Sequence, residues 1–191
     1  MAPGYILSQT TTLRDALHAA ISFDIFNRHA AKIEMANIAQ TINCLHSLFL
    51  AHEAKYARTP TYYVFEMYRG HMGANLVPSL IKAESLTVSV PEGNASIAAL
   101  SVSASIRGKR MTVTLTNPST QGPIATRIRT GDAKATEARA SVLKHDNMAA
   151  ANTFQNPNEV TLSKLSAAIS GNNVSLLIPK QAVVTVEIEL A

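Results

Sequence analysis

The sequence contains very little cysteine and no tryptophan, which excludes several kinds of site. Among its 191 residues, Cys44 is the one cysteine. A disulfide framework and a thiolate metal cluster both need several cysteines, so neither can form within this chain. Cys44 lies in an apolar, helix-like pattern, where a lone cysteine is usually a small buried side chain. We expect the chain to hold neither a metal nor a cofactor.

Charge is also sparse and scattered along the chain. There are 17 basic and 13 acidic residues, no basic run is longer than Lys109-Arg110, and 5% of the residues are aromatic. Proteins that bind nucleic acid usually gather Lys and Arg on one face and interleave aromatic side chains, so we expect no nucleic-acid partner. No apolar run reaches the ~20 residues of a membrane span, and residues 1–12 lack the pattern of a signal peptide. We expect no membrane partner and a cytoplasmic location.

The part of the chain before residue 83 is dominated by helical periodicity. Thr12-Leu-Arg-Asp15 is a variant of the capping box, and the apolar residues after it predict a helix over 12–28. Residues 33–52 leave two alternatives open, which are one continuous helix or a short buried strand at 33–38 followed by a helix. Pro60 predicts the start of a further helix.

The part after residue 83 is rich in Val, Thr, Ser and Ile and reads as a series of strands. Glycine-containing turns at Arg107-Gly108-Lys109 and Gly171-Asn172-Asn173 separate some of them. Many short strands at this spacing predict a β-sandwich or jelly roll. The expected strands are 84–90, 97–106, 110–116, 124–130, 136–145, 159–165 and 173–190, the last interrupted at Pro179.

Four segments of the chain, taken in order, match one enzyme family. They are Thr12-Leu-Arg-Asp-Ala-Leu-His-Ala-Ala20 with Ile25-Phe-Asn-Arg-His-Ala30, Met35-Ala-Asn-Ile-Ala-Gln-Thr-Ile-Asn43, Thr59-Pro-Thr-Tyr-Tyr-Val-Phe-Glu-Met-Tyr68 with His71 and Gly73, and Asn152-Thr-Phe-Gln-Asn-Pro157 with Leu177-Ile-Pro179 and Val183-Val-Thr-Val186. Together they resemble the C-terminal part of the family 51 glycoside hydrolases, the α-L-arabinofuranosidases. The chain departs from this family at three positions, where the family commonly has a His for Tyr63, a Gln for His46 and a His for Ala151.

The resemblance implies an α+β fragment, with the last elements of a (β/α)8 barrel at 1–83 and an antiparallel, jelly-roll-like β-sandwich at 84–191. It also implies a retaining glycosidase that releases terminal non-reducing α-L-arabinofuranosyl residues from hemicellulose. In the family both catalytic glutamates precede the first matching segment, so we expect no catalytic residue here and an inactive isolated chain. A retaining site needs two carboxyls about 5 Å apart. No spacing pairs Glu34, Glu53 and Glu66, which we interpret as solvated helix residues.

Gln40 is the one residue for which we predict contact with substrate. If 33–38 is the last barrel strand, Gln40 lies just past its C-terminal end, where barrel active sites are built. The resemblance implies that this glutamine hydrogen-bonds the sugar in the subsite where cleavage occurs, a task that suits an amide. The alternative is a surface glutamine on a continuous helix.

Other polar and aromatic residues fit structural roles better than chemical ones. His29 suits the end of a helix. Core packing is a better explanation than a sugar-stacking platform for the aromatic residues Tyr62, Tyr63, Phe65 and Tyr68.

Two further expectations concern partners and function. We expect an arabinose-containing oligosaccharide or polysaccharide as the partner, together with self-association, because an incomplete barrel leaves apolar faces uncovered. The alternative function is a non-catalytic carbohydrate-binding or structural β-sandwich with a helical leader. That alternative would need exposed aromatics on the sheet, and Phe154 is the only aromatic residue after position 83.

Overall fold

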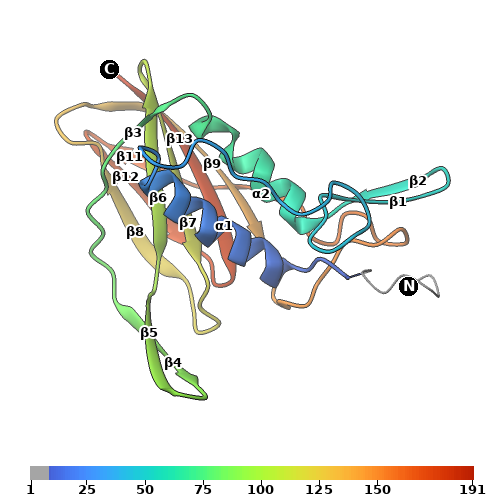
Figure 1. Ribbon diagram of the computed structural model, residues 1–191. Coiled ribbons are helices and arrows are strands. Elements are labelled where there is room, and N and C mark those ends of the chain that lie inside the picture. The colour runs from blue at the N-terminus through green and yellow to red at the C-terminus, as the bar shows by residue number, and fades with distance from the viewer. Residues whose placement is uncertain (1–8) are drawn as a thin grey trace.

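The computed structural model describes residues 9–191 as two helices packed on a β-sandwich (Figure 1). In chain order the elements are α1 (Leu13–Arg28), β1 (Phe49–His52), β2 (Lys55–Arg58), α2 (Pro60–Tyr68), the 3-10 helix η1 (Arg69–His71), β3 (Asn75–Leu76), β4 (Ser85–Val90), β5 (Gly93–Ala98), β6 (Ser101–Arg107), β7 (Arg110–Asn117), β8 (Ile124–Arg129), β9 (Ala135–Lys144), β10 (Leu162–Leu165), β11 (Ala168–Ser170), β12 (Asn173–Ile178) and β13 (Ala182–Leu190). Within this part of the chain, no helix is both long and apolar enough to span a bilayer.

The sandwich consists of a large and a small antiparallel sheet. The large sheet has six strands in the order β10-β9-β13-β7-β6-β3, and the small sheet has three in the order β11-β12-β8. The last strand, β13, lies at the centre of the large sheet, with β7 on one side and β9 on the other. Two hairpins, β1–β2 and β4–β5, form separate two-stranded sheets. The predicted α+β architecture with an antiparallel sandwich is therefore confirmed.

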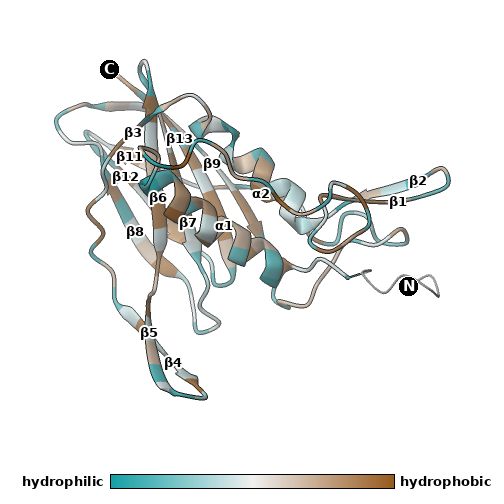
Figure 2. Cartoon of the chain, viewed as in Figure 1, coloured by the Kyte–Doolittle hydropathy of each residue, from teal (hydrophilic) through white to brown (hydrophobic). Residues whose placement is uncertain are grey.

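Strand alternation supplies the core between the two sheets. Every second residue of β7 and β13 faces the small sheet, including Val113, Leu115, Val184 and Val186, all 2% exposed or less. In Figure 2 the strands of the sandwich carry brown stretches between white and teal ones. Burying one such side chain contributes about 1.5–3 kcal/mol, so this layer dominates the stability of the sandwich.

The helices cover the opposite face of the large sheet. The apolar stripe of α1 packs against Tyr63, Val64 and Met67 of α2 and against the sheet residues Leu143 and Val183. The long helix lies across β6 and β7, as Figure 1 shows. Unlike the inner face, this face of β6 and β7 is lined by buried serine and threonine side chains. The helices therefore rest on a mixed polar and apolar surface.

Both predicted helix starts are confirmed. Asp15 Oδ2 accepts a hydrogen bond of 2.7 Å from the backbone N–H of Thr12, as a capping box requires. Pro60 is the first residue of α2, and the Thr59 hydroxyl accepts from the N–H of Tyr62 at 3.3 Å.

The predicted strands of the second half are largely confirmed. The strand expected at 97–106 divides near Ala99, because β5 pairs with β4 whereas β6 pairs with β7. The strand expected at 159–165 begins at Leu162, since the backbone of Val160 bonds instead to the Asn152 side chain. The interruption at Pro179 separates β12 from β13.

Both alternatives for residues 33–52 are wrong. Residues 33–48 contain neither a helix nor a strand, and Phe49–His52 is β1, paired with β2. Asn43 and Leu45 have φ angles of 63° and 52°, in the left-handed region that interrupts a helix. A parallel strand at 33–38 needs a neighbouring strand for its hydrogen bonds, and residues 9–191 place none beside it.

The division into a barrel part at 1–83 and a sandwich part at 84–191 stays a prediction. Residues 1–8 of the first part lie outside the described residues. The two parts touch closely, because β3 pairs with β6 and α1 packs on the large sheet.

Candidate functional site

The matching segments, far apart in sequence, converge around the start of α1 and the long loop before β10. The N–H groups of Leu13 and Arg14, unpaired within their own helix, donate to the carbonyls of Ala150 and Met148 at 2.9 and 3.0 Å. The first segment is thereby fixed to the loop that carries the fourth.

Asn152, in the fourth segment, is bonded to the residue just before the third segment from a buried position, with 1% of its surface exposed. Its Nδ2 donates to the carbonyls of Arg58 and Val160 at 2.8 and 2.9 Å, and its Oδ1 accepts from the N–H of Val160 at 2.7 Å. The amide thus satisfies three backbone groups, and the two that belong to Val160 would otherwise be buried without partners.

Gln40 lies in the irregular segment between α1 and β1, and it is exposed. Within residues 9–191 its side chain makes no hydrogen bond, whereas the backbone beside it is well held. The carbonyl of Thr41 accepts from the N–H groups of Leu48 and Phe49 at 3.1 and 3.0 Å. The side chain of Asn43 exchanges two hydrogen bonds with the backbone of Ala51, of 2.8 and 2.7 Å. A fixed backbone and a free amide are what a polar ligand contact requires.

Side chains of α2 contact residues of this loop and of β1. The Phe49 and Tyr62 rings lie 5.1 Å apart, and the Arg58 guanidinium lies 5.0 Å from the centre of the Tyr62 ring. His46 Nε2 lies 2.6 Å from Thr61 Oγ1, and burial lowers the pKa of His46, which favours the neutral ring.

The positions that depart from the family pattern have different surroundings. His46 is half-buried in the Gln40 segment, Ala151 is half-buried beside Asn152, and Tyr63 is 5% exposed within the helix core. Tyr63 and Tyr68 are buried and Tyr62 and Phe65 are half-buried, so core packing explains this aromatic group, as predicted.

The acidic and imidazole candidates are exposed and dispersed. Glu34 lies in the irregular segment, Glu53 in the β1–β2 turn and Glu66 on α2; all three are exposed, although only Glu66 is helical. His29 caps the end of α1 and is exposed, as expected. Cys44 is half-buried in a loop rather than buried in a helix. Among the described residues no group of three or more His, Cys, Asp or Glu side chains could hold a metal ion.

A buried polar cluster, which the sequence analysis missed, fixes α1 and α2 to the large sheet. Asp24 is 0% exposed, and its Oδ1 lies 2.7 Å from Tyr68 Oη, 2.9 Å from Ser103 Oγ and 2.8 Å from Thr114 Oγ1. His71 continues the cluster, with Nδ1 2.7 Å from Ser105 Oγ. The available signal was the position of Asp24 in line with Leu13, Leu17 and Ala20, on the apolar stripe of the helix.

The protonation states in this cluster follow from its burial. Desolvation raises the pKa of Asp24, partly offset by the hydroxyls that donate to it, and raises the pKa of Tyr68 well above its ordinary value. Burial lowers the pKa of His71 to about 4. Tyr68 Oη also lies 2.9 Å from the Ala20 carbonyl. Tyr68 Oη therefore lies within donating distance of both Asp24 Oδ1 and the Ala20 carbonyl, and the raised pKa of Asp24 favours its uncharged form.

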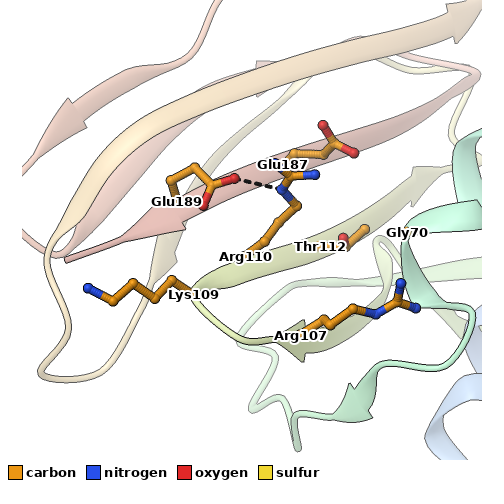
Figure 3. Close-up of a pocket in the computed structure, with 7 residues that line it drawn as sticks. All are labelled: Gly70, Arg107, Lys109, Arg110, Thr112, Glu187 and Glu189. Atoms are coloured by element: carbon orange, nitrogen blue, oxygen red, sulfur yellow. Dashed lines mark hydrogen bonds and ion pairs between the residues drawn. The ribbon is translucent and has the colours of Figure 1, made fainter.

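An open pocket of about 330 Å³ lies where β7 begins and β13 ends (Figure 3). Arg110 Nε donates to Glu189 Oε1 at 2.6 Å, while Arg107 and Lys109 point in other directions. Gly70 closes one side, and a Cβ there would lie 2.6 Å from Thr112 Oγ1. Since its charges are mixed and diverge, the pocket presents no convergent set of ligand groups.

Known proteins similar to this chain include members of one enzyme family. Residues 2–181 match the family model for the α-L-arabinofuranosidase C-terminal domain. An intracellular exo-α-L-arabinofuranosidase of Bacteroides ovatus is 32% identical over 192 aligned positions, which cover 98% of this chain and 37% of that protein.

Solved structures give the same result for the fold. The GH51 arabinofuranosidase of Xanthomonas axonopodis pv. citri superposes with a TM-score of 0.90 at 28% identity, over 98% of this chain and 38% of that one. The α-L-arabinofuranosidase of Thermotoga maritima, at 21% identity, has a TM-score of 0.84 over 96% of this chain and 40% of that one. The chain thus spans well under half the length of these relatives. Because the family model covers nearly all of the sequence, the chain belongs to the α-L-arabinofuranosidase C-terminal domain family.

Proposed function

We propose that this chain is the C-terminal portion of a retaining α-L-arabinofuranosidase that hydrolyses terminal non-reducing α-L-arabinofuranosyl residues of hemicellulose and releases L-arabinose. The family match over residues 2–181 is the observation that carries the proposal. The Bacteroides ovatus relative is an exo-α-L-arabinofuranosidase, and this chain aligns with 37% of it.

The two catalytic glutamates of the retaining reaction belong to the part of the enzyme that precedes this chain. One carboxyl attacks the sugar as nucleophile, and the other, about 5 Å away, protonates the leaving group and then activates water. None of the exposed carboxyls Glu34, Glu53 and Glu66 is a good substitute, because the general acid of such a site lies in a desolvated environment. We therefore propose that the chain has no catalytic carboxyl of its own.

Gln40 is the residue through which the chain touches the sugar. Its amide offers both a donor and an acceptor to sugar hydroxyls. The hydrogen bonds of Thr41 and Asn43 hold the backbone beside it, so that little conformational freedom is lost on binding. In this proposal α1, α2 and the loop around Asn152 form the frame that positions the Gln40 segment.

The cell compartment and the substrate follow from the same relatives. We propose a cytoplasmic enzyme, in line with the intracellular relative, acting on arabinose-containing oligosaccharides or polysaccharides. The carbohydrate-binding alternative gains no support from the described strands, because Phe154 lies in a half-buried loop position.

The test is the substitution Gln40→Ala in the complete enzyme, which includes the residues upstream of this chain. Loss of one neutral hydrogen bond costs about 0.5–1.5 kcal/mol, and more if the bond tightens in the transition state. We expect kcat/KM on an aryl α-L-arabinofuranoside to fall at least about three- to tenfold, with an unchanged melting temperature.

Gln121→Ala is the matched control, because Gln121 is equally exposed but lies in the loop between β7 and β8. It should leave both quantities unchanged. Equal kinetics for Gln40→Ala and the wild type would reduce Gln40 to a surface residue. A large fall in melting temperature would instead assign it a structural role.

A further inference from the structure

The β1–β2 hairpin projects beyond the start of α2, away from the sandwich (Figure 1). Its first strand is bonded to the segment that carries Gln40. The N–H of Phe49 donates to the carbonyl of Thr41, and the side chain of Asn43 binds both backbone groups of Ala51. The hairpin and the Gln40 segment therefore form one hydrogen-bonded unit, in which the position of one fixes the position of the other.

One face of this hairpin carries an exposed aromatic ring and a guanidinium. The antiparallel register places Tyr56 opposite Ala51, and Arg58 opposite Phe49. Because residues two apart in a strand share a face, these four side chains lie on the same side of the hairpin, which we call the Tyr56 face. Tyr56 is 65% exposed, and the small side chain of Ala51 opposite it covers little of its ring.

The guanidinium of Arg58 is held in place by aromatic contacts rather than by an acid. It lies 5.0 Å from the centre of the Tyr62 ring, which is itself 5.1 Å from the Phe49 ring. None of the ion pairs within residues 9–191 involves Arg58. Its planar set of N–H donors is therefore positioned but available to a ligand.

This combination of groups suits a neutral sugar ring. The C–H groups on one side of a pyranose form an apolar surface that packs against an aromatic ring, while its hydroxyls accept hydrogen bonds from N–H donors. An aromatic surface with a few fixed polar groups is the usual composition of a small-molecule site. On the Tyr56 face the phenol ring supplies the surface and Arg58 supplies the donors.

We propose that the Tyr56 face binds the sugar chain from which the arabinose is removed, through a neutral pyranose unit beyond the cleaved bond. The inference rests on the proposed function, in which Gln40 contacts the arabinosyl residue. Along β1, the pair that contains Tyr56 lies two residues, or about 7 Å, beyond the pair that contains Arg58. That spacing is comparable to the length of one sugar unit, so the face extends from the Gln40 segment in the manner of a chain-binding subsite.

The test compares two substrates of the complete enzyme. Methyl α-L-arabinofuranoside has no sugar beyond the cleaved bond, whereas a xylotetraose with one arabinofuranosyl branch does. Tyr56→Ala should lower kcat/KM on the branched xylotetraose about three- to tenfold more than on the methyl glycoside, mainly through a higher KM. Tyr56→Phe retains the ring and should keep the wild-type ratio of the two kcat/KM values. Lys55→Ala is the matched control and should also keep it, because Lys55 is exposed on the opposite face of the same hairpin.

Several results would overturn the inference. A wild-type ratio in Tyr56→Ala would show that the ring does not contact the sugar chain, and an equal change in Lys55→Ala would show that the Tyr56 face is not the binding face. A marked fall in the melting temperature of Tyr56→Ala would show that another part of the enzyme, or a second copy, covers the ring instead. A wild type that cleaves neither substrate would contradict the proposed function itself, whereas the first three results leave that function standing.

Discussion

Replacing Asp24 tests whether the buried cluster fixes the helices to the sheet as a neutral hydrogen-bonding unit. Asp24→Ala removes the shared acceptor of Tyr68, Ser103 and Thr114. Tyr68 keeps the Ala20 carbonyl at 2.9 Å, and the other two hydroxyls can bond each other at 2.8 Å. One or two hydrogen bonds are therefore lost, and a small cavity is left.

The expected cost follows from these remaining partners. A buried donor left unsatisfied costs about 1–3 kcal/mol, so Asp24→Ala should destabilise the chain by about 2–4 kcal/mol. At about 2–4 °C per kcal/mol for a chain of this size, the melting temperature should fall by about 5–15 °C. Asp24→Asn retains the shape and an acceptor oxygen, and it should cost less than about 1 kcal/mol at the pH where the native carboxyl is neutral.

The pH dependence separates the two variants further. Burial raises the pKa of folded Asp24 above the 3.8 of an ordinary aspartate, so the folded state binds more protons than the unfolded state between these two values. The wild type should therefore lose stability as pH rises through this window, by up to about 1.4 kcal/mol per pH unit from this residue. Asp24→Asn has no carboxyl at this position, so its stability should not fall with pH for this reason.

The assay is urea unfolding of the wild type and both variants at a series of pH values from acid to neutral. The stability of Asp24→Asn relative to the wild type should increase with pH. Parallel curves for the two proteins would refute a raised pKa. A near-wild-type Asp24→Ala would refute the role of the cluster itself.

The remaining predictions concern three other positions. Burial lowers the pKa of folded His71 to about 4, against 6.5 for an ordinary histidine, so the unfolded state binds more protons and stability should fall as pH drops from 6.5 towards 4. His71→Gln should flatten this part of an acid-unfolding curve measured by circular dichroism. Asn152→Ala removes three hydrogen bonds to the backbone, two of them buried, and should lower stability by about 2–4 kcal/mol in urea unfolding. Thr153→Ala, at the neighbouring exposed position, should cost far less. Gly70→Ala should also lower the melting temperature, because the added methyl group would meet the Thr112 side chain; an unchanged value would show that β7 and η1 can separate freely.

Local signals in the sequence predicted those elements whose stability is itself local. Asp15 and Pro60 mark helix starts through interactions within one turn, and both predictions are confirmed. The alternation of apolar with polar residues predicted β7 and β13, since every second residue of each strand faces the core between the two sheets. Positive φ at Gly108 and Gly171 accounts for the turns between β6 and β7 and between β11 and β12.

The errors arose where structure depends on distant partners. Apolar residues from Ile42 to Phe49 have helical spacing, yet this segment is held by backbone bonds between Thr41 and Phe49 and by the Thr59 hydroxyl bonded to the Ser47 carbonyl. The turn of the β1–β2 hairpin carries Glu53 at φ 53°, without the Gly or Asn that would have revealed it. Pairings 79 and 90 residues apart, such as those of Asp24 with Ser103 and Thr114, leave no local signal beyond one acidic residue in an apolar stripe.

For the candidate site, too, the sequence predicted one residue but not its surroundings. Family motifs led to the prediction for Gln40, which the structure describes as an exposed residue beside a well-held backbone. The contact of its amide with a sugar stays a prediction, because residues 9–191 surround this amide with no other sugar-binding group.

The most direct measurement is arabinose release from an aryl α-L-arabinofuranoside by the purified 191-residue chain, beside the complete enzyme with its upstream residues. We expect turnover by the complete enzyme and none above background by the chain alone, because we propose that both catalytic carboxyls lie outside this chain. Turnover by the pure chain that disappears on substitution of Glu34, Glu53 or Glu66 by Gln would contradict the account.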